Sequence, residues 1–391
     1  MIYIHFCFFI EKTHQKKHLY LRVGGVANQL LQLLPSYEKI DDLNISIVTK
    51  YTEYKPISKR VKIHEIQKFN VSAIDTIYFI VKSFFRLIKI HKKETINIID
   101  VNGYSIIILS PLLIRLLFKI PILMKLPIDF RSFIKQFYMI EKQKIRVKII
   151  SYSWFKFFKI FLLRKINFIR SLNEIMYNDL INLKFPKERI LKIPNGIDCR
   201  KFINIQKIKH EGAIFGYVGR LTEFKNLRFL LKVFKTHLIK YPKDKLFIYG
   251  LGSEEKYIED FIKENKLNKN IIYHGFEKNK FKIYPNIDVL VDPALAQGIS
   301  NTNLEAMITK TFLIASNVHG NRDLVKHQVT GLLFNPYKED DLLSQLKFYK
   351  EKQDVIDNIL NNAKNEIMQK YDIDTITNNV IKFIKAYYRH L

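Results

Sequence analysis

The segment IFGYVGRLTEFKN, residues 214–226, opens as an apolar strand, ends that strand in glycine, and leads into a helical pattern. Apolar residues then recur every three or four positions, at Leu227, Leu230, Leu231, Phe234 and Leu238. This spacing is typical of an amphipathic helix that buries one face. A strand followed at once by a helix is the unit from which parallel α/β sheets are built.

Further apolar runs of strand length follow in the C-terminal half. They lie at Leu246–Tyr249, Ile271–Tyr273, Val289–Val291, Phe312–Ala315 and Leu332–Phe334. Helix-like segments separate most of them, including 253–266, which begins with the cap signal Ser-Glu-Glu. Strands that alternate with helices at this spacing predict a doubly wound parallel sheet.

The N-terminal half shows a weaker version of the same alternation. Strands are predicted at 2–10, 45–49, 96–101, 122–126 and 166–170, and a helix at 26–34. We therefore expect an α/β protein with two Rossmann-like, doubly wound parallel-sheet domains. The two domains would face a central cleft, because open parallel sheets bind ligands at the carboxyl ends of their strands.

The chain length also requires more than one domain, since 391 residues exceed what a single core usually supports. Turn chemistry at Ile193–Asp198 marks the boundary between the halves. We expect one domain over 1–194 and a second over 195–370. A final helix within 371–391 is expected to pack back on the first domain.

The charge is high and unevenly distributed. The chain has 65 Lys and Arg against 37 Asp and Glu, a net charge of +28. Residues 1–200 hold 35 of the basic and only 15 of the acidic residues. An AT-rich genome would enrich lysine, but it would not confine the excess to one half. The asymmetry suggests that this half faces a polyanion, either anionic lipid or nucleic acid.

Cysteine use and hydropathy favour life in the cytoplasm. Cys7 and Cys199 make neither a disulfide framework nor a metal cluster. The apolar start, Ile2–Ile10, lacks the basic region and cleavage site of a signal peptide, so a buried strand is the better interpretation. The longest uncharged run, Val101–Ile114, is too short to span a bilayer, and no transmembrane helix is expected.

Two basic, aromatic segments lie in the first half. Residues 142–173 have nine Lys or Arg and no acid, interleaved with aromatic residues around Trp154, and 78–90 repeats the pattern. A helix of this composition suits an anionic bilayer surface. Alternatively, each is a core helix whose cations extend into solvent.

Two groups of residues follow predicted strands of the second domain. Arg220 and Lys225 stand just before a helix, where their charges suit a diphosphate; in a lysine-rich chain they could equally be solvated surface cations. In the second group, the strand at 289–291 runs through Gln297-Gly298 into a helix that begins near Ile299, Ser300, Asn301 and Thr302. Loop amides and a helix N-terminus can hold an anion.

Two further features complete the candidate site. Glu305, one turn into that helix, could accept hydrogen bonds from vicinal hydroxyls such as those of ribose, or could be a capping-box carboxylate. Gly24 and Gly25 open a helix in the first domain. A Gly-Gly turn is more often structural, but here it offers a backbone surface on the opposite side of the expected cleft.

Together these residues resemble glycosyltransferase family 4, the retaining enzymes of the GT-B architecture. The motifs that carry the resemblance are Pro194–Asp198, Gly219-Arg220 with Lys225-Asn226, Tyr249–Gly252, Gly298–Asn301 with Leu304–Met307, Gly320–Val325 and Thr330–Phe334. They occur in the family's order and spacing. The first domain matches only through Gly24-Gly25-Val26 and its general strand order.

The resemblance implies a role for each of these residues. Arg220 and Lys225 would bind the diphosphate of a sugar nucleotide, and Glu305 would hold its ribose. Amides around Ile299–Thr302 would hold the sugar or phosphate, and Gly25 would approach the diphosphate from the first domain. Such enzymes usually need no metal, and none is expected here.

The chain departs from the family pattern at two places. The family usually has a glutamate eight positions before Glu305, beside the donor sugar, and this chain has Gln297. The family often has a histidine after the fourth N-terminal strand, where this chain reads Lys125-Leu126-Pro127-Ile128-Asp129. Asp129 is therefore the candidate for the acceptor-side group, and Arg220, Lys225 and Gln297 complete the expected catalytic set.

The resemblance implies a glycosyltransferase of the hexosyltransferase type. It would move a sugar, with retention, from a nucleotide-diphosphate sugar to a lipid-linked or cell-surface polysaccharide or oligosaccharide, as in lipopolysaccharide or capsule synthesis. It would work at the inner face of the cell membrane as a peripheral protein. The alternative is a catalytically impaired scaffold or sugar-nucleotide-binding subunit. Nucleic-acid binding leaves the ordered phosphate-site motifs unexplained, so no such partner is expected.

Overall fold

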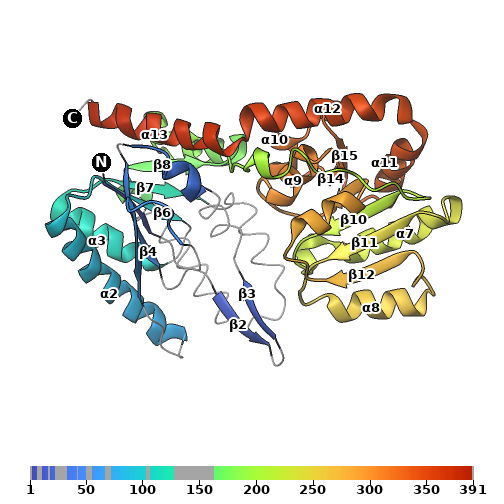
Figure 1. Ribbon diagram of the computed structural model, residues 1–391, viewed down its shortest axis with the longest axis horizontal. Helices are drawn as coiled ribbons and strands as arrows, with labels where there is room; N and C mark the ends of the chain where they lie inside the picture. Colours follow the sequence, from blue (N-terminus) through green and yellow to red (C-terminus); the bar gives the residue numbers. More distant parts are fainter. Residues whose placement is uncertain are drawn as a thin grey trace. The chain divides into compact units, whose positions relative to one another are not determined.

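The computed structural model describes residues 2–6, 11–15, 18–22, 33–41, 43–49, 55–66, 72–102, 106–126 and 163–389 (Figure 1). These residues form two compact units. The first takes the described residues up to 126, together with 163–196 and 376–389, and the second is 197–375. The final helix therefore starts in the second unit and ends in the first.

The first unit is built on a parallel sheet. Its strands are β1 (Ile2–Phe6), β4 (Asn44–Thr49), β5 (Val61–Glu65), β6 (Ile98–Asn102), β7 (Ile122–Lys125), β8 (Phe168–Ser171) and β9 (Ile190–Lys192). They lie in the order β5-β4-β1-β6-β7-β8-β9 and pair in parallel. The order reverses between β1 and β6, as in a doubly wound fold. A separate antiparallel pair joins β2 (Glu11–Gln15) and β3 (His18–Arg22).

Helices cover this sheet. They are α2 (Ser72–Lys93), α3 (Leu109–Phe118), α6 (Glu174–Asn182) and most of α13 (Ile373–Arg389). Helices α2 and α3 pack side by side (Figure 1). Both connect strands that advance in the same direction across the sheet, so right-handed crossovers place them on the same face.

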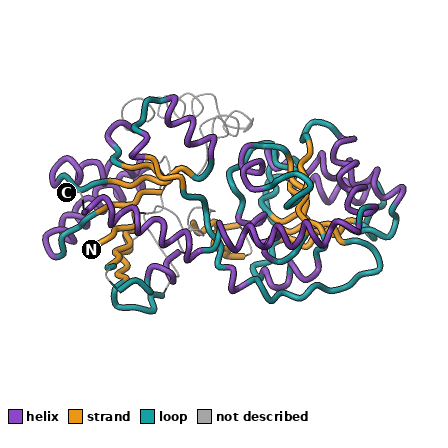
Figure 2. Tube along the Cα trace, turned by 90° about the horizontal axis from the view of Figure 1, so that it is seen from above, coloured by secondary structure: helices purple, strands orange, loops and turns teal. Residues whose placement is uncertain are grey.

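The second unit repeats this architecture more regularly. Its strands are β10 (Ile214–Val218), β11 (Lys245–Tyr249), β12 (Ile271–Gly275), β13 (Val289–Asp292), β14 (Phe312–Ser316) and β15 (Leu332–Phe334). They lie in the order β12-β11-β10-β13-β14-β15, all in parallel pairs. The helices are α7 (Leu227–Lys240), α8 (Glu255–Glu264), α9 (Asn301–Ile308), α10 (His319–Leu324), α11 (Glu339–Glu351) and α12 (Gln353–Lys370). Figure 2 shows the strands of this unit with helices around them.

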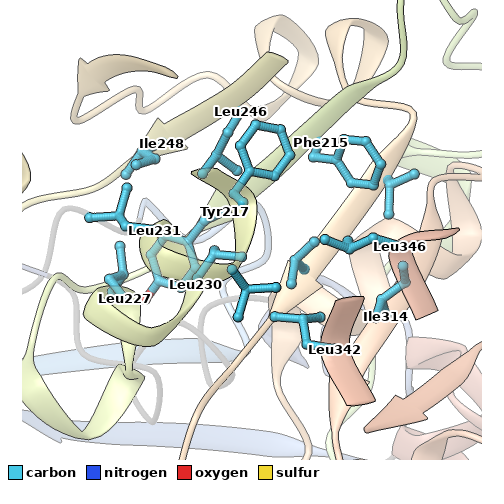
Figure 3. Close-up of a cluster of buried hydrophobic side chains, with 14 of the residues drawn as sticks. Phe215, Tyr217, Leu227, Leu230, Leu231, Leu246, Ile248, Ile314, Leu342 and Leu346 are labelled. Atoms are coloured by element: carbon cyan, nitrogen blue, oxygen red, sulfur yellow. The ribbon is translucent and has the colours of Figure 1, made fainter. Parts of the chain in front are cut away.

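The helices of the second unit form two layers. Helix α7 packs against α8 and α11, and α9 packs against α12. The main core lies between the sheet and the α7 layer and contains Phe215, Leu230, Leu246, Ile314 and Leu342 (Figure 3). Each such side chain contributes roughly 1.5–3 kcal/mol when it is fully buried. The sheet is thus fixed on one side by this core and on the other by the packing around α9.

The fold prediction is confirmed: both units are Rossmann-like parallel sheets. All six strands predicted between 214 and 334 are present, as is the helix predicted from Asn226, now α7. Strands predicted in the first half appear as β1, β4, β6, β7 and β8. Strands β2, β3, β5 and β9 were not predicted. The predicted helix at 26–34 falls mostly outside the described residues, as does the basic segment from 142 to 162.

The first residue of the second unit, Ile197, pairs with the segment that precedes the last helix. The amide of Ile197 donates to the carbonyl of Tyr371 at 2.8 Å, and the amide of Ile373 donates to the carbonyl of Ile197 at 2.9 Å. After this bridge the chain continues as α13, whose Phe383 and Tyr387 rings pack edge-on against Phe168 of the first unit. The last helix is therefore part of the first unit's packing.

Candidate functional site

The strand order of the second sheet brings two loops together. From β10 the chain goes to β11 and β12 on one side, then crosses to β13, β14 and β15 on the other. Strands β10 and β13 are neighbours, with Phe215 opposite Val289. The loops 219–225 and 293–300 therefore leave the same edge of the sheet at its topological switch point. Doubly wound sheets bind their ligands in this position.

Arg220 and Lys225 both lie on the first loop. Arg220 is exposed, and its guanidinium lies 5.5 Å from the centre of the Phe224 ring. Lys225 is half-buried at the end of a short 3-10 turn, Glu223–Lys225. The carbonyl of Phe224 accepts a hydrogen bond from the amide of Leu295 at 2.9 Å, which joins this loop to the loop after β13.

The residue after Lys225 fixes the turn into α7. Asn226 has a φ of 58°, in the left-handed region that asparagine adopts more readily than most residues. Its side-chain amide donates to the carbonyl of Pro336 at 3.2 Å. This conformation of Asn226 ends the 3-10 turn and starts α7. The backbone position of Lys225, next to it, is thereby fixed.

Lys225 points to the second loop. Its ammonium donates a hydrogen bond to Oε1 of Gln297. Burial lowers the pKa of Lys225 below its ordinary value, the nearby carboxylate of Asp292 opposes that shift, and the charge of Arg220 adds to it. Two cations on one loop and an amide on the other therefore lie close together at this edge of the sheet.

A buried polar network lies behind Gln297. The Gln297 amide nitrogen donates to Oδ2 of Asp292, and to Oδ1 of Asn321 at 2.9 Å. The amide nitrogen of Asn303 donates to the same two atoms, at 2.7 and 2.9 Å. Asn321 is held in turn because its own amide donates to the carbonyl of Ser316 at 3.0 Å. Asp292 and Gln297 are 7% and 6% exposed, so this network excludes most solvent.

Glycine 320 allows the loops to approach so closely. A Cβ at this position would lie 2.2 Å from the carbonyl carbon of Gly298, a distance that no real contact shows. The Gly320 amide donates to the carbonyl of Gln297 at 3.2 Å. The first turn of α10 is thereby packed directly on the backbone of the Gln297 loop.

The remaining residues predicted on this loop surround the start of α9. Ser300 is the N-cap residue, and Asn301 and Thr302 form the first turn. All three are half-buried, whereas Ile299 is buried. The positive end of the helix dipole therefore lies at the same edge of the sheet as Arg220 and Lys225.

Glu305 is more enclosed than the sequence suggested. Its side chain is 0% exposed. The Lys280 ammonium forms an ion pair with Oε1, and the Tyr284 hydroxyl donates to Oε2 at 2.7 Å. Burial raises the pKa of Tyr284 well above its ordinary value, and the Glu305 carboxylate adds to this shift. The structure thus shows Glu305 bonded within the protein, and a hydroxyl ligand would have to displace or join Lys280.

The candidate residues of the first half are not placed. Gly24, Gly25 and Asp129 lie outside the described residues. Lys125, which ends β7 just before that undescribed segment, is buried. Burial lowers its pKa well below the ordinary value, the charge of Arg170 adds to the shift, and Asp100 opposes it.

Sequence reasoning missed Asp292, Asn303 and Asn321 behind Gln297, and Lys280 and Tyr284 at Glu305. Asp292 could have been noticed, because an acid that closes an apolar strand is unusual. The others offered no local signal. In the part of the chain that the structure describes, no group of three or more His, Cys, Asp or Glu could hold a metal ion.

The second unit matches a known family. Residues 198–366 match the family model described as "Glycosyl transferases group 1". The chain is also 26% identical over 214 residues to an uncharacterised glycosyltransferase of Methanocaldococcus jannaschii, covering 51% of this chain and 55% of that protein. It is also 24% identical to the poly(ribitol-phosphate) alpha-N-acetylglucosaminyltransferase of Staphylococcus aureus, over 54% of this chain and 42% of that one.

The chain thus spans about half the length of these two relatives. A third relative matches almost the whole length of both chains. The UDP-Gal:alpha-D-GlcNAc-diphosphoundecaprenol alpha-1,3-galactosyltransferase of Escherichia coli is 26% identical over 394 residues, which are 93% of this chain and 95% of that protein.

Solved structures share the fold at low sequence identity. Sucrose-phosphate synthase of Thermosynechococcus elongatus superposes with a TM-score of 0.78 at 15% identity, over 100% of both chains. HepE of Anabaena, in complex with UDP-glucose, superposes with a TM-score of 0.74 at 13% identity, over 99% of this chain and 100% of that one. The two Rossmann-like units thus define a protein of the GT-B architecture. More narrowly, residues 198–366 form a domain that matches the group 1 glycosyl transferases.

Proposed function

We propose that this protein transfers a sugar from a nucleotide-diphosphate sugar, with retention, to a lipid-linked or cell-surface glycan acceptor. The observation that carries the proposal is the convergence of Arg220 and Lys225 on the loop after β10, with Gln297 binding Lys225 from the loop after β13. This arrangement suits a ligand that carries two adjacent phosphates and a sugar.

In the donor complex, Arg220 and Lys225 would contact the diphosphate. Negative charge grows on this leaving group as the bond to the sugar breaks, and fixed cations stabilise such charge most where water is excluded. Arg220 is exposed and free to fork onto phosphate oxygens, whereas Lys225 is already held in place. The start of α9, at Ile299–Thr302, would add backbone amides to the phosphate or sugar.

Glu305 would hold the ribose hydroxyls. Because Lys280 and Tyr284 occupy its carboxylate oxygens, the donor would exchange the Lys280 ion pair for hydrogen bonds from ribose. Lys280 is about one-third exposed and can move into solvent at little cost. Gly24 and Gly25 would approach the diphosphate from the first domain, and Asp129 would act on the acceptor side.

The acceptor is proposed from the relatives and from one surface of the first unit. Two relatives are named for transfer to poly(ribitol-phosphate) and to a diphosphoundecaprenol-linked sugar. No helix among the described residues is both long and apolar enough to cross a membrane. Because a lipid-linked acceptor lies in a bilayer, the proposal includes docking of this protein at the membrane surface.

The α2–α3 face is the surface we propose for this docking. It is formed by the exposed apolar residues Ile77, Val81, Phe85, Leu113, Leu116 and Leu117. The three on α2 recur every four positions and so form one stripe. Helix α3 packs beside α2 and supplies Leu113, Leu116 and Leu117 as its exposed apolar residues.

Charge favours an anionic bilayer as the partner of this face. Lys82, Arg86 and Lys89 follow the apolar stripe along α2, and Lys119 ends α3. From Thr76 to Lys93 and from Leu109 to Lys119 the sequence has no acid. Apolar side chains inserted below the headgroups, with cations beside them, are the pattern of an interfacial helix.

The donor half is tested by nucleotide binding. Thermal shift with UDP, GDP, ADP and CMP should show that one nucleotide stabilises the protein. Lys225→Met should lower the affinity for that nucleotide at least tenfold and abolish sugar transfer to acceptors in a cell-envelope extract. The matched control is Lys232→Met, because Lys232 is an exposed lysine on the outer side of α7, paired with Glu339.

Two outcomes would reject parts of the proposal. Stabilisation by none of the four nucleotides would reject the donor site. Specific binding without donor turnover in any acceptor extract would favour the alternative, a sugar-nucleotide-binding scaffold, because Gln297 replaces the family's glutamate beside the sugar.

A further inference from the structure

The network behind Gln297 explains why this position holds an amide. Its nitrogen faces two acceptor atoms, Oδ2 of Asp292 and Oδ1 of Asn321. Two acceptors can hold an NH₂ group, but they repel a carboxylate oxygen at the same place. With the nitrogen held there, the remaining atom, Oε1, faces the Lys225 ammonium. Asp292 and Asn321 therefore fix the orientation of the Gln297 amide.

The acceptors themselves cannot easily rotate away. Oδ1 of Asn321 is set by its own amide, which donates to the carbonyl of Ser316. Oδ2 of Asp292 accepts a second bond from Asn303, at 2.7 Å. Among the described residues of this cluster, Asp292 is the one carboxylate and Lys225 the one ammonium group, and they interact through Gln297.

We propose that Asp292 is a positioning residue for the donor site: it orients the Gln297 amide toward Lys225 and supplies the negative charge that balances this half-buried lysine. In this chain the carboxylate of the cluster is Asp292, at the end of β13, and position 297 holds an amide that donates to it. The proposal rests on the proposed function, since it assigns how the donor-binding lysine is held.

A simple physical consequence follows for a carboxylate at position 297. Gln297→Glu would place two buried carboxylates at hydrogen-bond distance, and two like charges in such a site cannot both ionise easily. The pair would retain one proton to well above the ordinary pKa of a carboxyl group. The variant should therefore work at low pH and fail as the pH rises and the second carboxylate ionises.

The experiment is a charge-exchange cycle with three variants: Asp292→Asn, Gln297→Glu, and both together. Asp292→Asn is nearly isosteric, and its carbonyl can still accept from Gln297 and Asn303. The readouts are affinity for the stabilising nucleotide of the panel and donor turnover, each at pH 6 and pH 8. Melting temperatures show which variants are folded.

We expect each single variant to lose at least tenfold in affinity or turnover at pH 8. Gln297→Glu should recover severalfold at pH 6, and the wild type should not. The double variant should exceed Gln297→Glu at pH 8 at least fivefold, because it again has one carboxylate beside Lys225. Recovery stays partial, since Oδ1 of Asn321 still faces an acceptor.

Additive losses in the double variant, or a pH profile of Gln297→Glu equal to that of the wild type, would overturn the proposal. If Asp292→Asn does not fold, the pH profile of Gln297→Glu decides alone. These outcomes are read only after the wild type has bound a nucleotide, so a failure of the donor site itself is recognised first.

Discussion

Lys207, in the segment that precedes β10, is a half-buried lysine outside the candidate site. Its ammonium donates to the carbonyl oxygens of Tyr284 and Ile287, at 2.9 and 2.6 Å, and to the hydroxyl of Thr311. Burial lowers the pKa of Lys207 from 10.5 to about 7, although Asp288 opposes the shift. The folded protein therefore holds this proton more weakly than the unfolded chain does.

The sign of the pH effect follows from this difference. Between pH 7 and pH 10.5 the unfolded chain keeps a proton on Lys207 that the folded protein has released, so the free energy of unfolding rises with pH. Below pH 7 both states are protonated and the gain is absent. The rise should be on the order of a few kcal/mol, at about 1.36 kcal/mol per pKa unit.

Urea unfolding at pH 6.5, 8 and 9.5 measures this rise. Lys207→Met should remove it, so the wild type should gain stability relative to the variant as the pH increases. Equal pH slopes for the two proteins would show that Lys207 stays charged in the fold.

The polar residues of the site could be predicted from sequence only in part. Arg220, Lys225 and Gln297 were predicted together because each follows a recognisable strand, and parallel strands end at one edge. Asp292, Asn303 and Asn321 could not be linked to them. Their contacts depend on the distance between the loops after β13 and β14, which Gly320 sets by backbone packing, and a single sequence does not encode that distance.

The α2–α3 face predicts that the protein binds anionic membranes. The full chain should sediment with vesicles that contain about one-third anionic lipid, and less with neutral vesicles or at high salt. Phe85→Ser with Leu116→Ser should reduce binding at least tenfold, because these side chains are 62% and 72% exposed and would enter the bilayer.

The control for that experiment is Ile239→Ser. Ile239 is an exposed apolar residue on α7 in the second unit, outside the α2–α3 face. It should leave vesicle binding unchanged. Unchanged binding in the Phe85 and Leu116 variant would instead assign docking to another part of the chain.

Strands were predicted unevenly for physical reasons. The central strands β10, β13 and β14 of the second unit are buried along almost their whole length, because helices cover both sides of that sheet, and such apolar runs are visible in sequence. Strand β5, VKIHE, alternates polar and apolar residues at the sheet edge, and β9 has only three residues. Edge and short strands gain their structure from a neighbour, so their own sequence says little.

The last helix, α13, packs on the first unit, so the beginning and the end of the described chain belong to the same unit. Phe383 and Tyr387 pack on Phe168, with ring centres 5.0 and 4.6 Å away. Phe383→Ala should lower the stability of the first unit by about 2 kcal/mol, below the cost at a fully buried site. Hydrogen exchange should quicken in β7 and β8 and stay unchanged in β10 and β11.

The neighbouring exposed residue supplies the control for this change. Lys382→Ala removes a side chain from the same turn of α13 without touching Phe168, and exchange should stay as in the wild type. Faster exchange in β10 after Phe383→Ala would mean that the two units do not unfold separately.

The closed network of Asp292, Gln297, Asn303 and Asn321 also limits how this protein can evolve. A single codon change from Gln297 to glutamate meets a carboxylate already in place, so we expect this step to be harmful by itself. The change at position 292 is expected to be harmful alone as well, so the two changes must come together. Among descendants of this chain we therefore expect the identities at these two positions to be inherited as a pair, a case of epistasis built into the loops of one sheet edge.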